Sequence, residues 1–215
     1  MSRRNYLRID EREDAINALE FVADLSPTLA RKPTNWKWCL LAAHSALQGF
    51  LVCTLAGTAG IGVMDSESQK RFLRWNEDSR SNPNAEWPKI RMASPAELYR
   101  RVHDASWMGQ FGGTPIFTSA AEDKDVRLLN HLRRDFVHFE PKGWSIELVG
   151  LPRLILTAIA ICERLFNRPG CSFRLNQSQR RRVQRSLTRI RGCLVDREQP
   201  KSRRRKRPVQ TAERG

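Results

Sequence analysis

The sequence predicts an all-α fold, an antiparallel helical bundle followed by a basic C-terminal tail. Apolar residues recur at i, i+3 and i+4 through most of the chain, which is the period of a helix with one buried face. Helix start and stop signals border these stretches, and we find no clear alternation of apolar and polar residues that would indicate a strand. The 215 residues are 40% hydrophobic and include six Trp, so the chain can build a globular core.

The first two predicted helices carry the clearest patterns. Residues 11–30 place apolar side chains at helical spacing with charges between them, which predicts an amphipathic helix. A second helix is expected to begin at Trp36 or Trp38 and to continue to about Ala56, because Gly57 and a second glycine follow.

Residues 39–64 include no charged side chain and are long enough to span a bilayer, which takes about 20 apolar residues. However, His44 and Gln48 would then lie near the middle of the membrane, where polar groups are costly. We therefore expect a buried core helix that ends in a Gly-rich loop, and no membrane partner.

The middle of the chain begins with a polar stretch that is broken by three prolines and holds a short predicted helix at 66–75. A strong helix start follows, with Ser94 at the N-cap, Pro95 at the first helical position and Glu97 at the third. We expect this helix to stop at Gly109.

Three more helices complete the predicted bundle. Thr118 and Ser119 begin one, with acidic residues in its first turn, and it ends before Pro141. The next covers residues 151–166 and is strongly apolar. A last amphipathic helix is expected from 176 to 194, with four apolar side chains at helical spacing, namely Val183, Leu187, Ile190 and Leu194.

The net charge of +15 is concentrated at the C-terminus. Residues 168–215 contain 16 basic and three acidic side chains, a net of +13, which leaves +2 for the rest. We accordingly divide the chain into a helical domain (1–170), a basic amphipathic helix (171–198) and a disordered basic tail (199–215).

Such a density of basic charge predicts binding to RNA or another polyanion, with an affinity that depends strongly on salt. Little aromatic character accompanies this charge, so the tail should bind without regard to sequence. The residues that we expect to bind nucleic acid are Arg180, Arg181, Arg182, Arg185, Arg203, Arg204, Arg205, Lys206 and Arg207.

The five cysteines show no C-x-x-C spacing and are odd in number, which argues against a disulfide framework and against a structural zinc site. The first 14 residues contain no apolar segment typical of a signal peptide. Phosphate-binding glycine loops and zinc-protease motifs are absent from the sequence. We therefore expect a cytoplasmic protein with reduced thiols, no cofactor and no metal.

Residues 130–140 are the segment that predicts chemistry. In it Arg133 lies five positions before His138, near the end of an apolar-backed helix. This spacing resembles the R-x4–6-H motif of the HEPN superfamily, compact helical bundles that include many RNA endonucleases. Residues 38–55 and 132–147 together resemble an uncharacterised bacterial HEPN-like family, in which the two segments are paired helices.

The resemblance implies a metal-independent endoribonuclease of toxin or defence type, with an antitoxin-type protein as a further partner. The ribose 2′-OH would attack the adjacent phosphorus and leave a 2′,3′-cyclic phosphate. His138 would serve in proton transfer and Arg133 would hold the phosphate. Because one His cannot be base and acid at once, the resemblance also implies a homodimer that brings two motifs into one cleft.

The motif departs from the family pattern directly after the Arg, where Arg134 replaces a short polar residue and Asp135 is a possible substitute for it. Arg134 is four positions from His138, so the sequence leaves open which Arg faces the cleft. His44 and Gln48 are either second-shell residues near the motif or a buried hydrogen-bonded pair. The alternative function is a non-catalytic module that binds nucleic acid or protein.

Overall fold

The computed structural model describes residues 6–7, 9–110, 113–138, 141, 143, 145–172 and 174–198. In these residues the regular elements are helices, and strand-like pairing is limited to one antiparallel bridge between Met64 and Met92. The predicted all-α class is therefore confirmed. The tail at 199–215, predicted to be disordered, lies outside the described residues.

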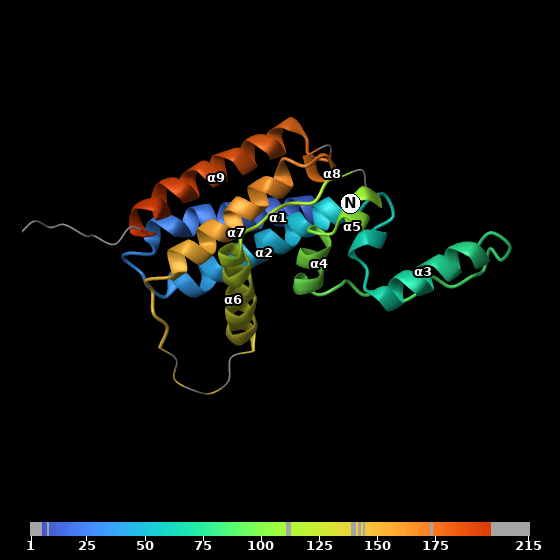
Figure 1. The fold of residues 1–215 in the computed structure, drawn as a ribbon, viewed down its shortest axis with the longest axis horizontal. Coiled ribbons are helices and arrows are strands. Elements are labelled where there is room, and N and C mark those ends of the chain that lie inside the picture. Colours follow the sequence, from blue (N-terminus) through green and yellow to red (C-terminus); the bar gives the residue numbers. More distant parts are fainter. Residues whose placement is uncertain are drawn as a thin grey trace, which may run out of the picture.

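The predicted helices occur in the expected order, and a short helix, α8, was not predicted (Figure 1). Their bounds are α1 Glu11–Leu25, α2 Asn35–Leu55, α3 Ser66–Asp78, α4 Pro95–Arg101, α5 Ala105–Gln110, α6 Ala120–Val137, α7 Leu151–Phe166, α8 Pro169–Ser172 and α9 Gln177–Glu198. Two 3-10 turns, Ser26–Thr28 and Ile61–Val63, follow α1 and α2.

Two predicted helices differ from the structure at points where side chains compete with the helical backbone. The first helix changes to a 3-10 turn after Leu25, because Pro27 lacks the N–H group that an α-helix needs. The helix predicted from Ser94 to Gly109 is two helices. The carboxylate of Asp104 accepts a hydrogen bond from the N–H of Ser106 at 2.8 Å, and this starts α5.

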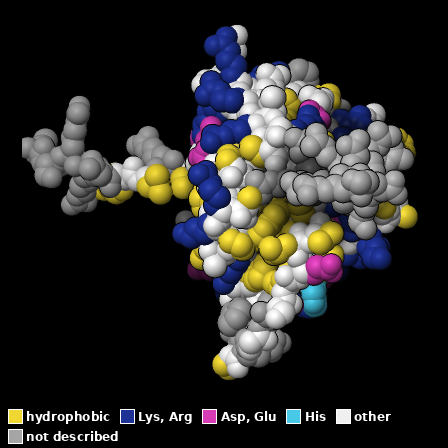
Figure 2. Space-filling view, turned by 90° about the vertical axis from the view of Figure 1, so that its left-hand side faces the viewer, with side chains coloured by type: hydrophobic (Ala, Val, Ile, Leu, Met, Phe, Trp, Pro, Cys, Tyr) yellow, Lys and Arg dark blue, Asp and Glu magenta, His cyan; other side chains and the backbone are white. Residues whose placement is uncertain are grey.

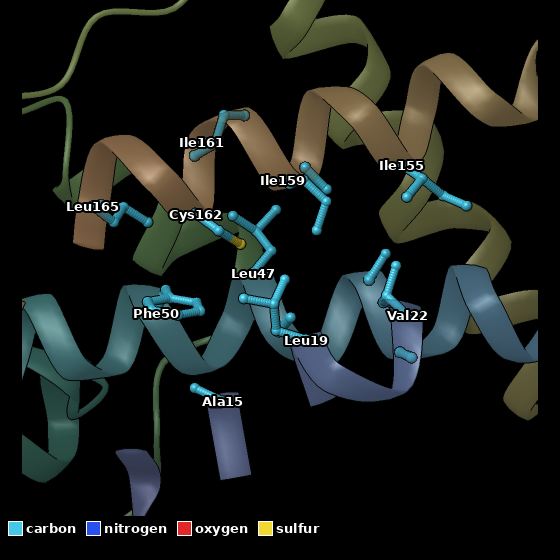
Figure 3. Close-up of a cluster of buried hydrophobic side chains, with 14 of the residues drawn as sticks. Ala15, Leu19, Val22, Leu47, Phe50, Ile155, Ile159, Ile161, Cys162 and Leu165 are labelled. Atoms are coloured by element: carbon cyan, nitrogen blue, oxygen red, sulfur yellow. The ribbon is translucent and has the colours of Figure 1, made fainter. Parts of the chain in front are cut away.

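The hydrophobic core lies where α1, α2, α7 and α9 pack side by side (Figure 1). Figure 3 shows side chains of α1, α2 and α7 meeting in it, among them Leu19, Leu47 and Ile159. Val183 and Ile190 of α9 are also fully buried in the same core. The basic helix α9 is therefore packed into the bundle.

The apolar helix α2 is long enough to cross a membrane, yet 72% of its most apolar window is buried inside the fold. It contacts α1 on one side and α7 and α6 on others. This is the environment of a core helix in a soluble protein. Among the described helices, no other one is both long and apolar enough to span a bilayer.

Helix α6 is fixed to the bundle by polar contacts. Ser119 and Glu122 form a capping box at its first turn. The buried carboxylate of Asp125 accepts hydrogen bonds from Nε and Nη2 of Arg153, at 3.1 and 3.0 Å, and one from Thr157 Oγ1 at 3.0 Å. These bonds tie α6 to α7 and set the direction in which the far end of α6 leaves the core (Figure 1).

Candidate nucleic-acid interface

An open groove of about 390 Å³ lies between α1, α2 and the second half of α6. We call it the α6 groove. Its walls combine apolar side chains with three polar side chains from α2 and one Arg from α6. The lining residues are Ala18, Phe21, Trp38, Leu41, Ala42, His44, Ser45, Gln48, Arg133 and Val137.

Arg133 is the cation of this groove. Its side chain is half-buried, and within the described part of the chain its guanidinium makes no hydrogen bond or ion pair. A guanidinium offers five N–H donors in a planar fork suited to phosphate oxygens. Arg133 is therefore available to an anion that enters the groove.

Arg134 has different surroundings. It is exposed, its Nη2 donates to Nδ1 of His131 at 2.7 Å, and its Nε lies 3.7 Å from the carboxylate of Asp135. Asp135 also lies 3.2 Å from Nε2 of His131. These three side chains form a cluster on the solvent side of α6, so the structure places Arg133, and not Arg134, in the groove.

His44 lies on the floor of the α6 groove and is 4% exposed. Its Nε2 is 2.7 Å from Oδ1 of Asn130 on α6. Because an amide oxygen only accepts, Nε2 carries the proton, and the neutral ring keeps a lone pair on Nδ1. Burial lowers the pKa of His44, the hydrogen bond with Asn130 opposes this, and the nearby charge of Arg133 lowers the pKa further.

Gln48 is one turn after His44, is half-buried and also lines the groove. The hydrogen-bond partner of His44 is Asn130, across the α2–α6 contact, rather than Gln48 on its own helix. The pair His44 and Asn130 therefore links the apolar helix α2 to the helix that carries Arg133.

His138 is the C-cap residue of α6, and its side chain is exposed. Its backbone N–H closes the last turn by donating to the carbonyl of Arg134 at 2.9 Å. Five residues correspond to about 140° around a helix, so Arg133 and His138 leave α6 in different directions. Within one chain the structure brings Arg133 next to His44, and it leaves His138 at the end of the helix, beyond Val137 on the groove rim.

The rim of the groove exposes large apolar side chains. Phe21 is 49% exposed, Trp38 is 52% exposed and Val137 is 51% exposed. Lys37 lies 5.3 Å from the ring centre of Trp38. Figure 2 shows hydrophobic side chains gathered on one face of the molecule, with basic side chains along its borders. Exposed apolar surface of this kind is typical of an interaction site.

The four arginines of α9 that are predicted to bind nucleic acid divide into two groups. Arg182 donates to Glu13 at 2.8 Å and to Glu20 at 2.7 Å on α1, and the guanidinium of Arg180 donates to the backbone carbonyls of Leu175 and Ser172. These two side chains bind the bundle. Arg181 and Arg185 are exposed. The remaining predicted nucleic-acid contacts, Arg203, Arg204, Arg205, Lys206 and Arg207, lie outside the described residues.

The sequence did not identify Asn130 as the partner of His44, because a contact between two helices that are distant in the chain produces no local pattern in the sequence. It also gave no partner to Tyr99 or His103. In the structure both side chains reach Thr118, at 3.3 and 2.8 Å. The helix-start signal at Thr118 was visible in the sequence, but a hydroxyl at a helix start usually caps that helix.

Comparison of the chain with protein-family models, with curated proteins and with solved structures found no match. In the described residues, no group of three or more His, Cys, Asp or Glu side chains is arranged to hold a metal ion.

Proposed function

We propose that the protein binds and cleaves RNA as a homodimer, with the α6 groove at the dimer interface. The observation that carries this proposal is the position of Arg133, a guanidinium without a carboxylate partner in the described residues, beside a neutral His44 and inside an apolar rim. A phosphate would supply the negative charge that pairs with Arg133, and a second copy of the chain would cover the apolar rim.

The chemistry would follow from two protomers. The ribose 2′-oxygen attacks the adjacent phosphorus while one His138 accepts the 2′-OH proton. The bond to the 5′-oxygen breaks, and the second His138 donates a proton to that leaving oxygen. The products are a 2′,3′-cyclic phosphate and a 5′-OH. Arg133 stabilises the charge that develops on the phosphorane oxygens. His138 is suited to this role because it is exposed next to the rim, within reach of a partner chain.

A second candidate is supported by the apolar rim. Phe21, Trp38 and Val137 would equally fit a protein partner, in which case the groove binds without cleaving. Both candidate functions use the same surface, so a binding measurement does not distinguish them. The presence of cleaved RNA does.

The test is incubation of single-stranded RNA with the protein in EDTA, with the 3′ ends of the products analysed. We expect products that end in a 2′,3′-cyclic phosphate from the wild type and none from His138→Ala. The matched control is His131→Ala, an exposed His on the same helix that faces away from the groove, and it should cleave like the wild type. Intact RNA with the wild type would leave only the binding candidate.

A further inference from the structure

A second open cavity, of about 550 Å³, lies on the other side of Asn130, between α4, the segment at 116–118 and the first half of α6. We call it the Asp123 cavity. Apolar side chains, including Ile116 and Val126, form its floor, and polar groups of α4 and α6 converge at its edge. A volume of this size with a few converging polar groups is typical of a small-molecule site.

The polar groups are linked through Thr118. The hydroxyl of Tyr99 lies 2.8 Å from Oδ1 of Asp123, and the hydroxyl of Thr118 lies 2.7 Å from the same oxygen. Nε2 of His103 is 2.8 Å from the Thr118 hydroxyl, and its Nδ1 is 2.7 Å from the carbonyl of Tyr99. This network holds one oxygen of Asp123 in a fixed position.

The second carboxylate oxygen, Oδ2, accepts no hydrogen bond in the described part of the chain. The hydrogen bond from Thr118 lowers the pKa of Asp123, and the bond from Tyr99 adds to this effect, so the carboxyl group is ionised at neutral pH. An ionised oxygen at the edge of a cavity selects a ligand that donates hydrogen bonds there.

Two exposed side chains at the mouth of the cavity define the rest of the ligand. Phe117 is 83% exposed, which is unusual for a large aromatic ring and suits stacking on a flat group. Arg127 is exposed and has no ion pair in the described residues. The cavity thus offers a stacking surface, a hydrogen-bond acceptor and a cation, which correspond to the base, its exocyclic amino group and the phosphate of a nucleotide.

We infer that the Asp123 cavity binds a nucleotide whose base carries an exocyclic amino group. The base stacks on Phe117, its amino group donates to Oδ2 of Asp123, and its phosphate contacts Arg127. Arg127 and Arg133 are six residues apart, about 9 Å along the helix axis. This inference rests on the proposed function in one respect, namely that the nucleotide belongs to an RNA strand whose neighbouring phosphate lies at Arg133.

The test is equilibrium binding of three nucleoside monophosphates, CMP, AMP and UMP, to the full chain. We expect CMP and AMP to bind about tenfold more tightly than UMP, because UMP has the acceptor O4 in place of the amino donor of CMP, and two acceptor oxygens would then face each other at Oδ2. In Asp123→Asn, Oδ1 still accepts from Tyr99 and Thr118, and an NH2 group replaces Oδ2. The preference should therefore shift towards UMP, whose O4 accepts a hydrogen bond.

Two controls accompany this measurement. Asp14→Asn makes the same charge change at an exposed site on α1 and should leave all three affinities unchanged. Arg127→Ala should weaken the three nucleotides by similar factors. Equal binding of the three nucleotides to the wild type, no binding of any of them, or an unchanged preference in Asp123→Asn would overturn the inference.

The outcome is separable from the proposed function. If the protein binds CMP more tightly than UMP but leaves RNA intact, nucleotide binding in the Asp123 cavity is supported and the proposed RNA cleavage is ruled out. If RNA is cleaved equally at every base, and equally by Asp123→Asn, the proposed cleavage is supported and nucleotide recognition by the Asp123 cavity is ruled out.

Discussion

Arg133 and Arg134 are adjacent in the sequence and differ in everything around them. The charge of Arg133 acts on the buried ring of His44, whereas Arg134 is engaged by His131 and Asp135 in solvent. The pKa of His44 therefore reports which Arg faces the groove. We expect it below 6.5, the ordinary value for His, and we expect Arg133→Ala to raise it because a nearby positive charge is removed.

An NMR titration of the imidazole signals measures this directly. Arg134→Ala is the control and should leave the pKa of His44 within experimental error of the wild type. An equal upward shift in both variants would show that Arg133 is not specifically beside His44.

The lowered pKa of His44 also affects the stability of the fold. The unfolded ring binds a proton more readily, so His44 opposes folding increasingly as the pH falls below about 6.5.

A substitution of Asp125 tests whether its hydrogen bonds hold α6 against α7. Its buried carboxylate accepts hydrogen bonds from Arg153 and Thr157 of α7. We expect Asp125→Ala to lower the free energy of unfolding by about 1–3 kcal/mol, measured by urea denaturation. The loss is smaller than for a fully buried ion pair because Arg153 is half exposed and stays solvated. A loss below about 0.5 kcal/mol would contradict the structural role of this contact.

At the scale of elements, the contact between α1 and α2 depends on Gly49. A Cβ added there would lie 2.6 Å from Cβ and 2.9 Å from Cα of Ala15, so the two helices would have to separate. We expect Gly49→Ala to destabilise the protein by about 1–3 kcal/mol in urea denaturation. Gly192 on α9 has open space, and Gly192→Ala should instead stabilise by up to about 1 kcal/mol. Equal effects of the two substitutions would contradict this packing.

Through Arg101, helix α4 anchors the segment around the 3-10 turn Ile61–Val63, which precedes α3. This guanidinium is fully buried, donates to the carbonyls of Gly62 and Met64, and is paired with Glu97 at 2.8 Å. Arg100 and then Arg101 hold the pKa of Glu97 at about 2, below its ordinary 4.5. Because the folded pKa is depressed, the stabilisation from Glu97 is present above pH 4.5 and is lost as the pH falls towards 2.

A comparison of wild type with Glu97→Gln in urea, from pH 7 down to pH 2.5, measures that loss. The difference between their midpoints should be largest above pH 4.5 and should shrink below it. A difference that is constant over the whole range would mean that the charge of Glu97 does not stabilise the fold.

Most of the helices were predictable because their signals are local. Ser119 and Glu122 indicated the start of α6. The apolar side chains at helical spacing from Val183 to Leu194 indicated the buried face of α9. The break at Asp104 was missed, since a side chain that caps the next helix competes with a continuous one only through its detailed geometry. The salt bridges of Arg182 were also missed, because they depend on α9 lying beside the acidic face of α1.

The candidate site was predictable only in part, for the same reason. The sequence singled out Arg133, and it placed His44 near the motif helix as one of two alternatives. Which Arg enters the groove is decided by the rotation of α6 against α2. That rotation is set by long-range contacts such as Asp125 with Thr157, so no local spacing encodes it.

At the scale of the whole molecule, the apolar rim predicts self-association. Trp38→Glu would place a charge within the proposed dimer interface, and we expect it to shift the protein from dimer to monomer in sedimentation experiments. Leu73→Glu is the control, since Leu73 is equally exposed but lies on α3, away from the groove. A wild type that sediments as a monomer would contradict the dimer.

The salt dependence of RNA affinity shows whether Arg133 binds an RNA phosphate. Each phosphate contact to single-stranded RNA contributes about −0.7 to the slope of log affinity against log salt. We expect Arg133→Ala to weaken binding and to make this slope less steep by about that amount, while Arg134→Ala leaves both unchanged. A loss of slope in Arg134→Ala, with none in Arg133→Ala, would show that Arg133 does not bind the phosphate.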